Sequence, residues 1–269
     1  MSALAGDLAA ETAVTRDLVA DLSEVGWQTP TPAVGWTIAD QIGHLAYFDE
    51  MAVKSAVRPE EFTADLAATA ASGAAVDPET LAAQYRDRTS GQILDWFDAA
   101  RATLLGTFAE LDPGRRVPWF GVAMSAASSL TARIMETWAH TQDIADALGV
   151  TREPTDRLRH IAHIGVGARA FSYLAHGLPA PDVPVLVTLT APSGVIWTWG
   201  PADATDQVIG PALDFCLLVT QRRHHDDLDL DVEGPAALQW MEIAQAFAGP
   251  PGPGRRPGQF PAPSPDPGR

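Results

Sequence analysis

The chain has 269 residues, and 46% of them are hydrophobic, which is enough for the packed core of one large or two modest domains. Its 18 Lys and Arg residues face 34 Asp and Glu residues, and the formal net charge of −16 disfavours contact with phosphate backbones and anionic lipid, so we expect no nucleic-acid and no membrane partner. The single cysteine, Cys216, excludes an intrachain disulfide and a cysteine zinc cluster; together with an N-terminus that lacks a signal-peptide pattern, this predicts a cytoplasmic protein.

Helical patterns dominate residues 1–150. Thr37 is a favourable N-cap with Asp40 three residues later, and Asp77-Pro78 is a second start signal, because Asp caps a helix and Pro fits its first turn. Gly149 marks the end of the last helix in this part of the chain. The predicted helices cover residues 4–24, 38–57, 78–110 and 129–148, with an Ala-rich connector after the second and a loop after the third. Four such helices predict a bundle.

A change of sequence pattern near residue 178 predicts a second domain. Residues 185–189 and 195–199 are rich in β-branched and aromatic side chains and flank a turn, which is typical of a hairpin. Acidic and aliphatic residues alternate through 227–233, the pattern of a strand with one solvated face. Helices are predicted over residues 154–176, 206–220 and 235–248.

These elements predict an α+β fold, in which a helical bundle at 1–150 is followed by a connecting helix at 151–178 and a small α/β domain at 179–248. Residues 249–269 are rich in Pro and Gly and poor in apolar side chains, so we expect a disordered tail there.

Three side chains in the predicted bundle have the chemistry of a metal site. Glu136 and His140 are four residues apart in a helix, so their side chains project from one face on successive turns. His44, on the second predicted helix, offers a third ligand. Two imidazoles and one carboxylate suit zinc and leave a fourth position open for water, a thiol or a substrate.

The same spacing has a second interpretation. Arg133, Glu136, His140 and Asp143 fall on one stripe of their helix, opposite an apolar stripe, and an ordinary solvated polar face produces this pattern often. His44 borders the apolar stripe of its own helix, where a core histidine is equally compatible with the sequence. Periodicity leaves the metal site and the polar face open.

Two motifs carry a resemblance to a known family. Gly35-Trp36-Thr37 before a helix that contains His44-Leu45, together with Arg-x-x-Glu-x-Trp-x-His at 133–140, resembles the mycothiol-dependent maleylpyruvate isomerase-like family of the DinB-like superfamily, over about residues 4–149. The resemblance implies a DinB-like four-helix bundle that binds zinc or another divalent metal through His44, Glu136 and His140. Residues 185–249 resemble a small C-terminal domain named for wyosine base formation, although the negative charge argues against a role in tRNA modification.

What the resemblance implies for chemistry is an enzyme with a low-molecular-weight thiol, mycothiol in that family, as cosubstrate and an electrophilic small molecule as substrate. The metal would lower the thiol pKa, and the thiolate would add to an electrophilic carbon, in an isomerase or a transferase reaction. Arg133 is a candidate to hold a substrate carboxylate and Asp143 to orient His140. Arg222 and Arg223 are candidates to bind an anionic substrate or thiol. Alternatively, they are cationic residues that a helix C-terminus favours through its dipole.

Two other classes of function fit the same residues. One is a non-catalytic metal-binding or ligand-recognition module, which thiol consumption would distinguish from an enzyme. The other is a helical scaffold that binds no metal. Both a monomer and a homodimer are compatible with a bundle of this kind.

Overall fold

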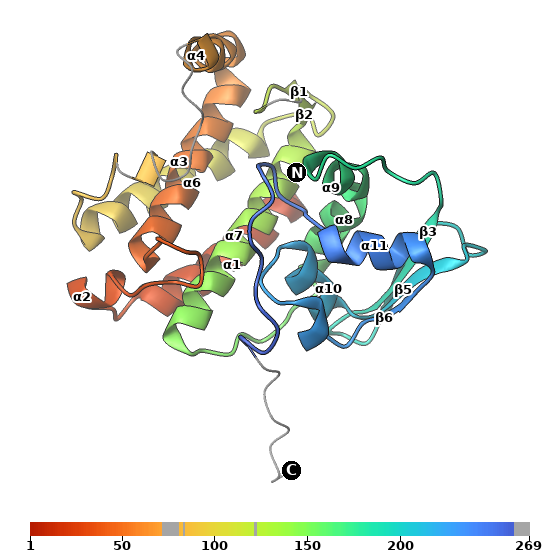
Figure 1. The fold of residues 1–269 in the computed structure, drawn as a ribbon. Coiled ribbons are helices and arrows are strands. Elements are labelled where there is room, and N and C mark those ends of the chain that lie inside the picture. The colour runs from red at the N-terminus through yellow and green to blue at the C-terminus, as the bar shows by residue number, and fades with distance from the viewer. Residues whose placement is uncertain (72–80, 83, 121–122, 261–269) are drawn as a thin grey trace. The chain divides into compact units, whose positions relative to one another are not determined.

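The computed structural model describes residues 1–71, 81–82, 84–120 and 123–260, and it divides the chain into two compact units, Met1–Arg152 and Glu153–Arg269 (Figure 1). Within the described residues, none of the helices combines the length and apolar character needed to cross a membrane. The first unit is mainly helical, whereas the second combines helices with a four-stranded sheet. The α+β fold class is confirmed.

The first unit is built on four long helices. They are α1 (Ser2–Val19), α3 (Ile38–Val57), α6 (Ser90–Ala109) and α7 (Ala126–Leu148). Helix α3 packs against α6 and α7, and α1 packs against α7 and α6, which gives the expected bundle (Figure 1). The shorter elements are α2 (Glu24–Trp27), α4 (Pro59–Ala71) and a hairpin of β1 (Arg116–Val117) and β2 (Met124–Ser125).

The capping residues predicted from the sequence are found at the start of α3 and at the end of α7. The Thr37 hydroxyl accepts a hydrogen bond from the Asp40 backbone N–H at 3.3 Å, and the Asp40 carboxylate accepts one from the Thr37 N–H at 2.8 Å, so α3 begins with a capping box. Helix α7 ends at Gly149, whose φ of 67° lies in the left-handed region. The start and end of α3 and the end of α7 are therefore confirmed.

Differences from the predictions in this unit concern the first helix, the connector and the third helix. The first helix ends at Val19, because Ser23 caps a separate short helix, α2. The Ala-rich connector forms helix α4, since Ala-rich sequence favours a helix wherever one face has a core to cover, here through buried Phe62. The prediction of one helix from 78 to 110 is wrong, because turns occupy residues 84–87 and a bend follows at 88. Thr89 then starts α6 with its own capping box. The Asp77-Pro78 signal lies outside the described residues.

The second unit contains a mixed sheet with the strand order β4-β3-β5-β6. The strands are β3 (Val185–Thr190), β4 (Ile196–Trp199), β5 (Asp206–Pro211) and β6 (Asp231–Glu233). The predicted hairpin is confirmed as the antiparallel pair β3–β4, and β5 pairs parallel with β3. The helices are α8 (Leu158–Gly167), α9 (Arg169–Ala175), α10 (Ala212–Val219) and α11 (Pro235–Ile243), with a 3-10 turn, η1, at His225–Asp227.

Three predictions for this unit are corrected. The stretch 206–220 is half strand and half helix: residues from Asp206 pair with β3 until Pro211, which cannot donate to the ladder and stands at the N-cap of α10. The helix over 154–176 is two helices, α8 and α9, which pack against α10 and α11. The strand over 227–233 is confined to β6 at its end. Of the predicted tail, residues 249–260 carry turns and irregular backbone, and the rest lies outside the described residues.

Gly43, next to His44, sets how closely α3 is packed. A Cβ at this position would overlap the ring of Tyr85, whose side chain is 2% exposed. We expect Gly43→Ala to lower the free energy of unfolding by about 1–3 kcal/mol, the usual cost of overpacking a core. Urea denaturation would measure the change.

Gly106 provides the matched control, because it is exposed on α6 and has no heavy atom within 4 Å of an added Cβ. Gly106→Ala should raise the free energy of unfolding by up to about 1 kcal/mol, through helix propensity alone. Equal effects of the two substitutions would contradict the close packing of Tyr85 on α3.

Candidate metal centre

Three side chains from two helices meet in the first unit. His44 projects from α3, and Glu136 and His140 project from one face of α7. The Glu136 Oε2 atom lies 3.3 Å from Nε2 of His140 and 3.8 Å from Nε2 of His44, and the two imidazole rings are 4.4 Å apart between centroids. One ligand atom from each residue lies within 4.8 Å of the others, a spacing at which all three can bind one ion.

The other ring nitrogen of His140 is held by a chain of hydrogen bonds. The Gln41 amide nitrogen donates to the Thr31 hydroxyl at 2.9 Å, and this hydroxyl donates to the Trp36 carbonyl at 3.0 Å. The Gln41 amide oxygen therefore faces Nδ1 of His140, with which it forms a hydrogen bond. Because an amide oxygen only accepts, Nδ1 carries a proton, which leaves Nε2, on the side of Glu136, as the ring nitrogen that can bind a metal.

Aromatic rings enclose the two histidines. The Trp36 ring stacks on His140 at 5.9 Å with an interplanar angle of 17°, and it lies 5.1 Å from the His44 ring. On the other side, the Phe48 ring is 4.6 Å from that of His44. Such packing restricts the orientation of the imidazoles and leaves the His44 and His140 side chains only 13% and 11% exposed.

The surroundings set the protonation states of the three candidate ligands. Burial lowers the pKa of His44 to about 4, with a further contribution from nearby His140. Burial alone would raise the pKa of Glu136, but the favourable interactions of its carboxylate with the adjacent His140 and His44 side chains outweigh burial and hold the pKa well below its usual value. At neutral pH, His44 is neutral and Glu136 is ionised, the forms in which both bind metals.

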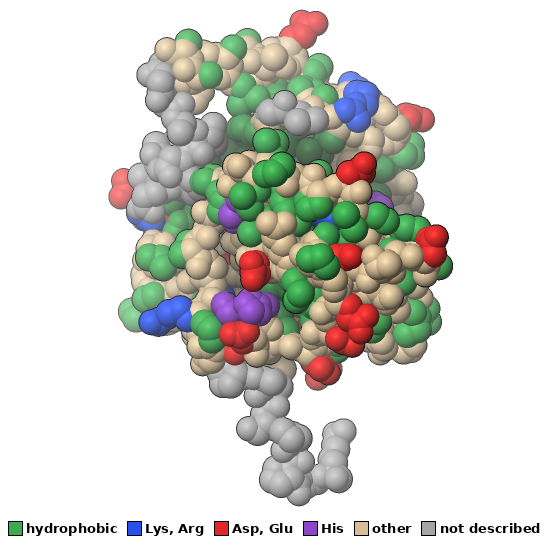
Figure 2. Space-filling view, turned by 45° about the vertical axis from the view of Figure 1, so that its right-hand side comes forward, with side chains coloured by type: hydrophobic (Ala, Val, Ile, Leu, Met, Phe, Trp, Pro, Cys, Tyr) green, Lys and Arg blue, Asp and Glu red, His purple; other side chains and the backbone are tan. Residues whose placement is uncertain are grey.

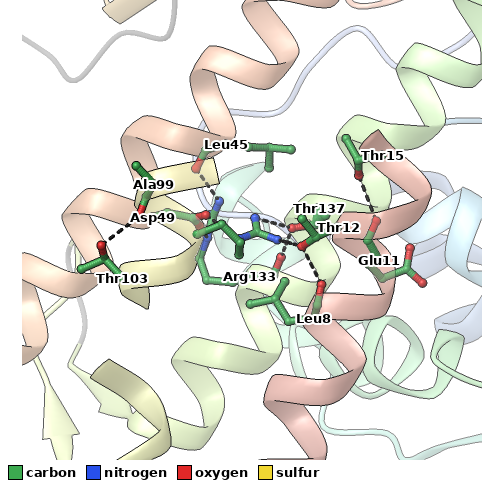
Figure 3. A network of polar contacts seen from close by, with 11 residues as sticks. Leu8, Glu11, Thr12, Thr15, Leu45, Asp49, Ala99, Thr103, Arg133 and Thr137 are labelled. Atoms are coloured by element: carbon green, nitrogen blue, oxygen red, sulfur yellow. Dashed lines mark hydrogen bonds and ion pairs between the residues drawn. The ribbon is translucent and has the colours of Figure 1, made fainter. Parts of the chain in front are cut away.

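A buried network of ion pairs and hydrogen bonds next to this site connects all four bundle helices (Figure 3). Asp49 on α3 accepts hydrogen bonds from Arg101 of α6 at 2.6 Å and from Arg133 of α7 at 2.9 Å. Arg101 also donates to Thr12 of α1 and, at 3.0 Å, to Thr137 of α7. Asp49 is fully buried, so the two guanidinium groups supply the charge compensation that water would otherwise give.

The solvated polar face considered for this stripe of α7 is wrong. Arg133 is 3% exposed, His140 9% and Asp143 0%. Within this stripe Arg133 binds Asp49, and Glu136 and His140 lie beside the third candidate ligand, His44, so these polar groups face other polar side chains of the bundle. The hydrogen-bond partner of His140 Nδ1 is Gln41. From the sequence we expected Asp143 to orient His140.

The other candidates belong to the second unit. Arg222 donates to the Thr220 carbonyl at 2.6 Å, and the Arg223 guanidinium lies 4.4 Å above the Phe260 ring. Cys216 is fully buried, and burial raises its thiol pKa well above the usual value, which fits a core residue. His224, His225 and Asp226 also bring ligand atoms together, but His224 Nδ1 accepts a hydrogen bond from the Asp226 backbone N–H, which fits a polar turn.

Sequence reasoning missed Gln41, Trp36, Asp49 and Arg101 as parts of this site. Gln41 lies one helical turn before His44 and Asp49 lies five residues after it, so both positions were visible as polar interruptions in a helix. Trp36 could have been noticed as an aromatic residue directly before a helix N-cap. The local sequence around Arg101 does not indicate its role, because its partners come from three other helices.

Comparisons with known proteins agree with this architecture. Residues 8–145 match the family described as mycothiol maleylpyruvate isomerase N-terminal domain, and residues 181–231 match the family described as wyosine base formation. Two uncharacterized proteins of Mycobacterium tuberculosis, from strains H37Rv and CDC 1551, are each 47% identical to the chain over 249 residues, or 93% of this chain and 96% of theirs.

Two solved structures share the fold. The crystal structure of the mycothiol-dependent maleylpyruvate isomerase has a TM-score of 0.57 at 17% identity, covering 88% of this chain and 95% of that chain. A histidine-to-alanine mutant of the same isomerase has a TM-score of 0.56 with the same identity and coverage.

The pKa of His44 predicts a pH dependence of stability. The unfolded chain binds a proton at His44 near pH 6.5, whereas the folded protein takes it up only near pH 4. The free energy of unfolding of metal-stripped protein should therefore fall as the pH drops from 6.5 to 4, by up to about 3 kcal/mol from this group. Urea unfolding across this range, compared with His44→Gln, would measure the contribution; equal slopes for the two proteins would contradict it.

The hydrogen-bond chain predicts the tautomer of His140. Long-range proton–nitrogen NMR spectra of metal-free protein should show the proton on Nδ1. Gln41→Leu removes the acceptor and should produce a mixture of tautomers, while Gln84→Leu, at an exposed position, should leave His140 unchanged. A retained Nδ1 proton in Gln41→Leu would show that Gln41 does not fix the ring.

Proposed function

This chain belongs to the mycothiol maleylpyruvate isomerase family, and from that we propose that it is a cytoplasmic, metal-dependent enzyme that adds a small thiol to an electrophilic small molecule. His44, Glu136 and His140 would hold zinc or another divalent ion, and mycothiol is the thiol that the relatives' name indicates. The observation that carries the proposal is the convergence of these three ligand atoms, from two helices, within 4.8 Å.

The residues fit such an ion in three respects. Two imidazoles and one carboxylate form a set that suits zinc and leaves one coordination position for an exchangeable ligand. The lowered pKa values of His44 and Glu136 provide a neutral imidazole and an ionised carboxylate at neutral pH. Gln41 keeps the proton of His140 on Nδ1, so that its Nε2 lone pair is available.

A divalent ion held by His44, Glu136 and His140 would supply a Lewis acid that lowers the pKa of a thiol. The thiolate sulfur would form a bond to an electrophilic carbon of a conjugated double bond, and the π electrons would move to the adjacent carbonyl oxygen. In an isomerase, the carbon–carbon bond rotates and the thiolate leaves again. In a transferase, a proton equivalent to that lost by the thiol adds to carbon and the thioether stays.

The chain's own residues would hold this geometry. Trp36 and Phe48 flank the imidazoles and exclude water, and Gln41 orients His140. For Arg133 we propose a positioning role, since its contacts with Asp49 and the Leu45 carbonyl anchor the turn of α7 that precedes Glu136. Asp143, Arg222 and Arg223 remain candidates without an assigned step.

Metal analysis with two variants tests the ligand set. The purified parent should contain about one zinc or equivalent ion per chain, and folded His44→Ala and His140→Ala variants should contain almost none. His163→Ala, at an exposed histidine of the second unit, is the control and should keep the metal. A parent that takes up no added zinc would contradict the site.

Thiol consumption then separates an enzyme from a binding module. With mycothiol and maleylpyruvate, the metal-loaded parent should isomerise the substrate or consume the thiol, at a rate that falls at least about a hundredfold in His44→Ala. Metal binding with neither reaction would favour the non-catalytic module for this pair of compounds.

A further inference from the structure

The second unit contains a group of potential metal ligands that the proposed function does not use. His224, His225 and Asp226 occupy consecutive positions at η1, after the end of α10. One ligand atom from each residue lies within 4.8 Å of the other two, the same spacing that the candidate metal centre of the first unit has. Consecutive side chains converge only where the backbone is shaped to bring them together, and η1 gives the backbone that shape.

The turn holds the three side chains close to one another. Nδ1 of His225 lies 3.0 Å from the Asp226 carboxylate, and Nδ1 of His224 lies 3.5 Å from it. The two imidazole rings are 4.2 Å apart between centroids. The Asp226 backbone N–H donates to Nδ1 of His224 at 3.2 Å, which shapes the turn and leaves Nε2 of that ring for an ion. A polar turn and an ion site are therefore compatible here.

The group is open to ions from solvent, and its surroundings favour a cation. The side chains of His224, His225 and Asp226 are 26%, 48% and 56% exposed. The two arginines that precede the histidines donate to backbone carbonyls, Arg222 to that of Thr220 at 2.6 Å and Arg223 to that of Arg222 at 2.7 Å. The carboxylates of two consecutive aspartates, at 226 and 227, supply negative charge in the turn itself.

We infer that His224, His225 and Asp226 form a second metal site, for a divalent transition ion such as zinc. Two imidazoles and a carboxylate suit zinc, nickel and copper, whereas magnesium and calcium prefer sites made of oxygen ligands. Binding is weaker than at the buried centre, because exposed side chains lose rotational freedom when they bind, so dialysis removes this ion. The site shares no residue with the candidate metal centre, and the inference stands independently of the proposed function.

An ion at this site would stabilise the turn that holds the end of the described chain. The Asp227 carboxylate accepts a hydrogen bond from the Gly258 N–H at 2.8 Å, and the Arg223 guanidinium lies 4.4 Å above the Phe260 ring. A ligand stabilises the conformation that binds it. Zinc should therefore slow hydrogen exchange of the Gly258 amide in the full chain.

Zinc titration of the full chain, without a polyhistidine tag, tests the site. By isothermal titration calorimetry, the double variant His224→Asn/His225→Ala should bind one zinc per chain fewer than the parent. The asparagine keeps an acceptor for the Asp226 N–H, because Asn side chains close turns of this kind, so the variant removes the imidazoles and not the turn. Magnesium should bind to this site at least about tenfold more weakly than zinc.

His163→Ala is the matched control, since His163 is an exposed histidine of the same unit, and it should bind as many zinc ions as the parent. Equal zinc stoichiometry in the parent and the folded double variant overturns the inference, and so does magnesium binding as tight as that of zinc. A double variant that still binds one zinc leaves the candidate metal centre intact. A parent that binds one zinc, lost in the folded double variant, supports this site and overturns the proposed function alone.

Discussion

The buried carboxylate of Asp49 is the interaction on which the first unit depends. It binds Arg101 and Arg133 at once, and through Arg101 the network reaches Thr12 and Thr137, so one charge cluster connects α1, α3, α6 and α7. Removing one partner of a buried ion pair typically costs about 3–5 kcal/mol, because the remaining charges lose their compensation. The network therefore fixes the relative positions of α3 and α7 more firmly than apolar packing alone could, since apolar contacts tolerate small sliding.

The candidate metal centre inherits its geometry from this constraint. His44 precedes Asp49 by five residues on α3, and Glu136 follows Arg133 by three on α7, so the salt bridge and the ligand atoms are about one and a half turns apart on α3 and about one turn apart on α7. A shift of either helix that separated Asp49 from Arg133 would also separate His44 from Glu136. Gln41, one turn on the other side of His44, completes the arrangement by orienting His140. Three consecutive turns of α3 thus serve orientation, ligation and anchoring.

Local signals in the sequence predicted those parts of the fold that local chemistry decides. Thr37 with Asp40 and the left-handed Gly149 fix helix ends by hydrogen bonds within a few residues, so the start of α3 and the end of α7 agree with prediction. The stretch from Asp206 to Pro211 does not agree with the predicted helix. It is a strand because it pairs with β3, which lies about twenty residues earlier, and so short a segment shows no periodic pattern of its own. The wrong assignment there has the same cause as the missed role of Arg101: in both, the deciding partner is distant in sequence.

The sequence by itself determined which chemical groups are available: two histidines and a glutamate in predicted helices, and a single cysteine. It also determined the acidic composition, and Figure 2 shows acidic side chains spread over one face of the molecule. It also determined the family, through short motifs around His44 and His140. Only the tertiary structure decided that the polar stripe of α7 is buried. The periodic pattern of polar residues in a helix is the same whether its polar face contacts water or other polar groups. The pKa values of His44 and Glu136 and the tautomer of His140 depend likewise on atoms brought together from α3, α7 and the segment before α3, and distances between those atoms exist only in the folded chain.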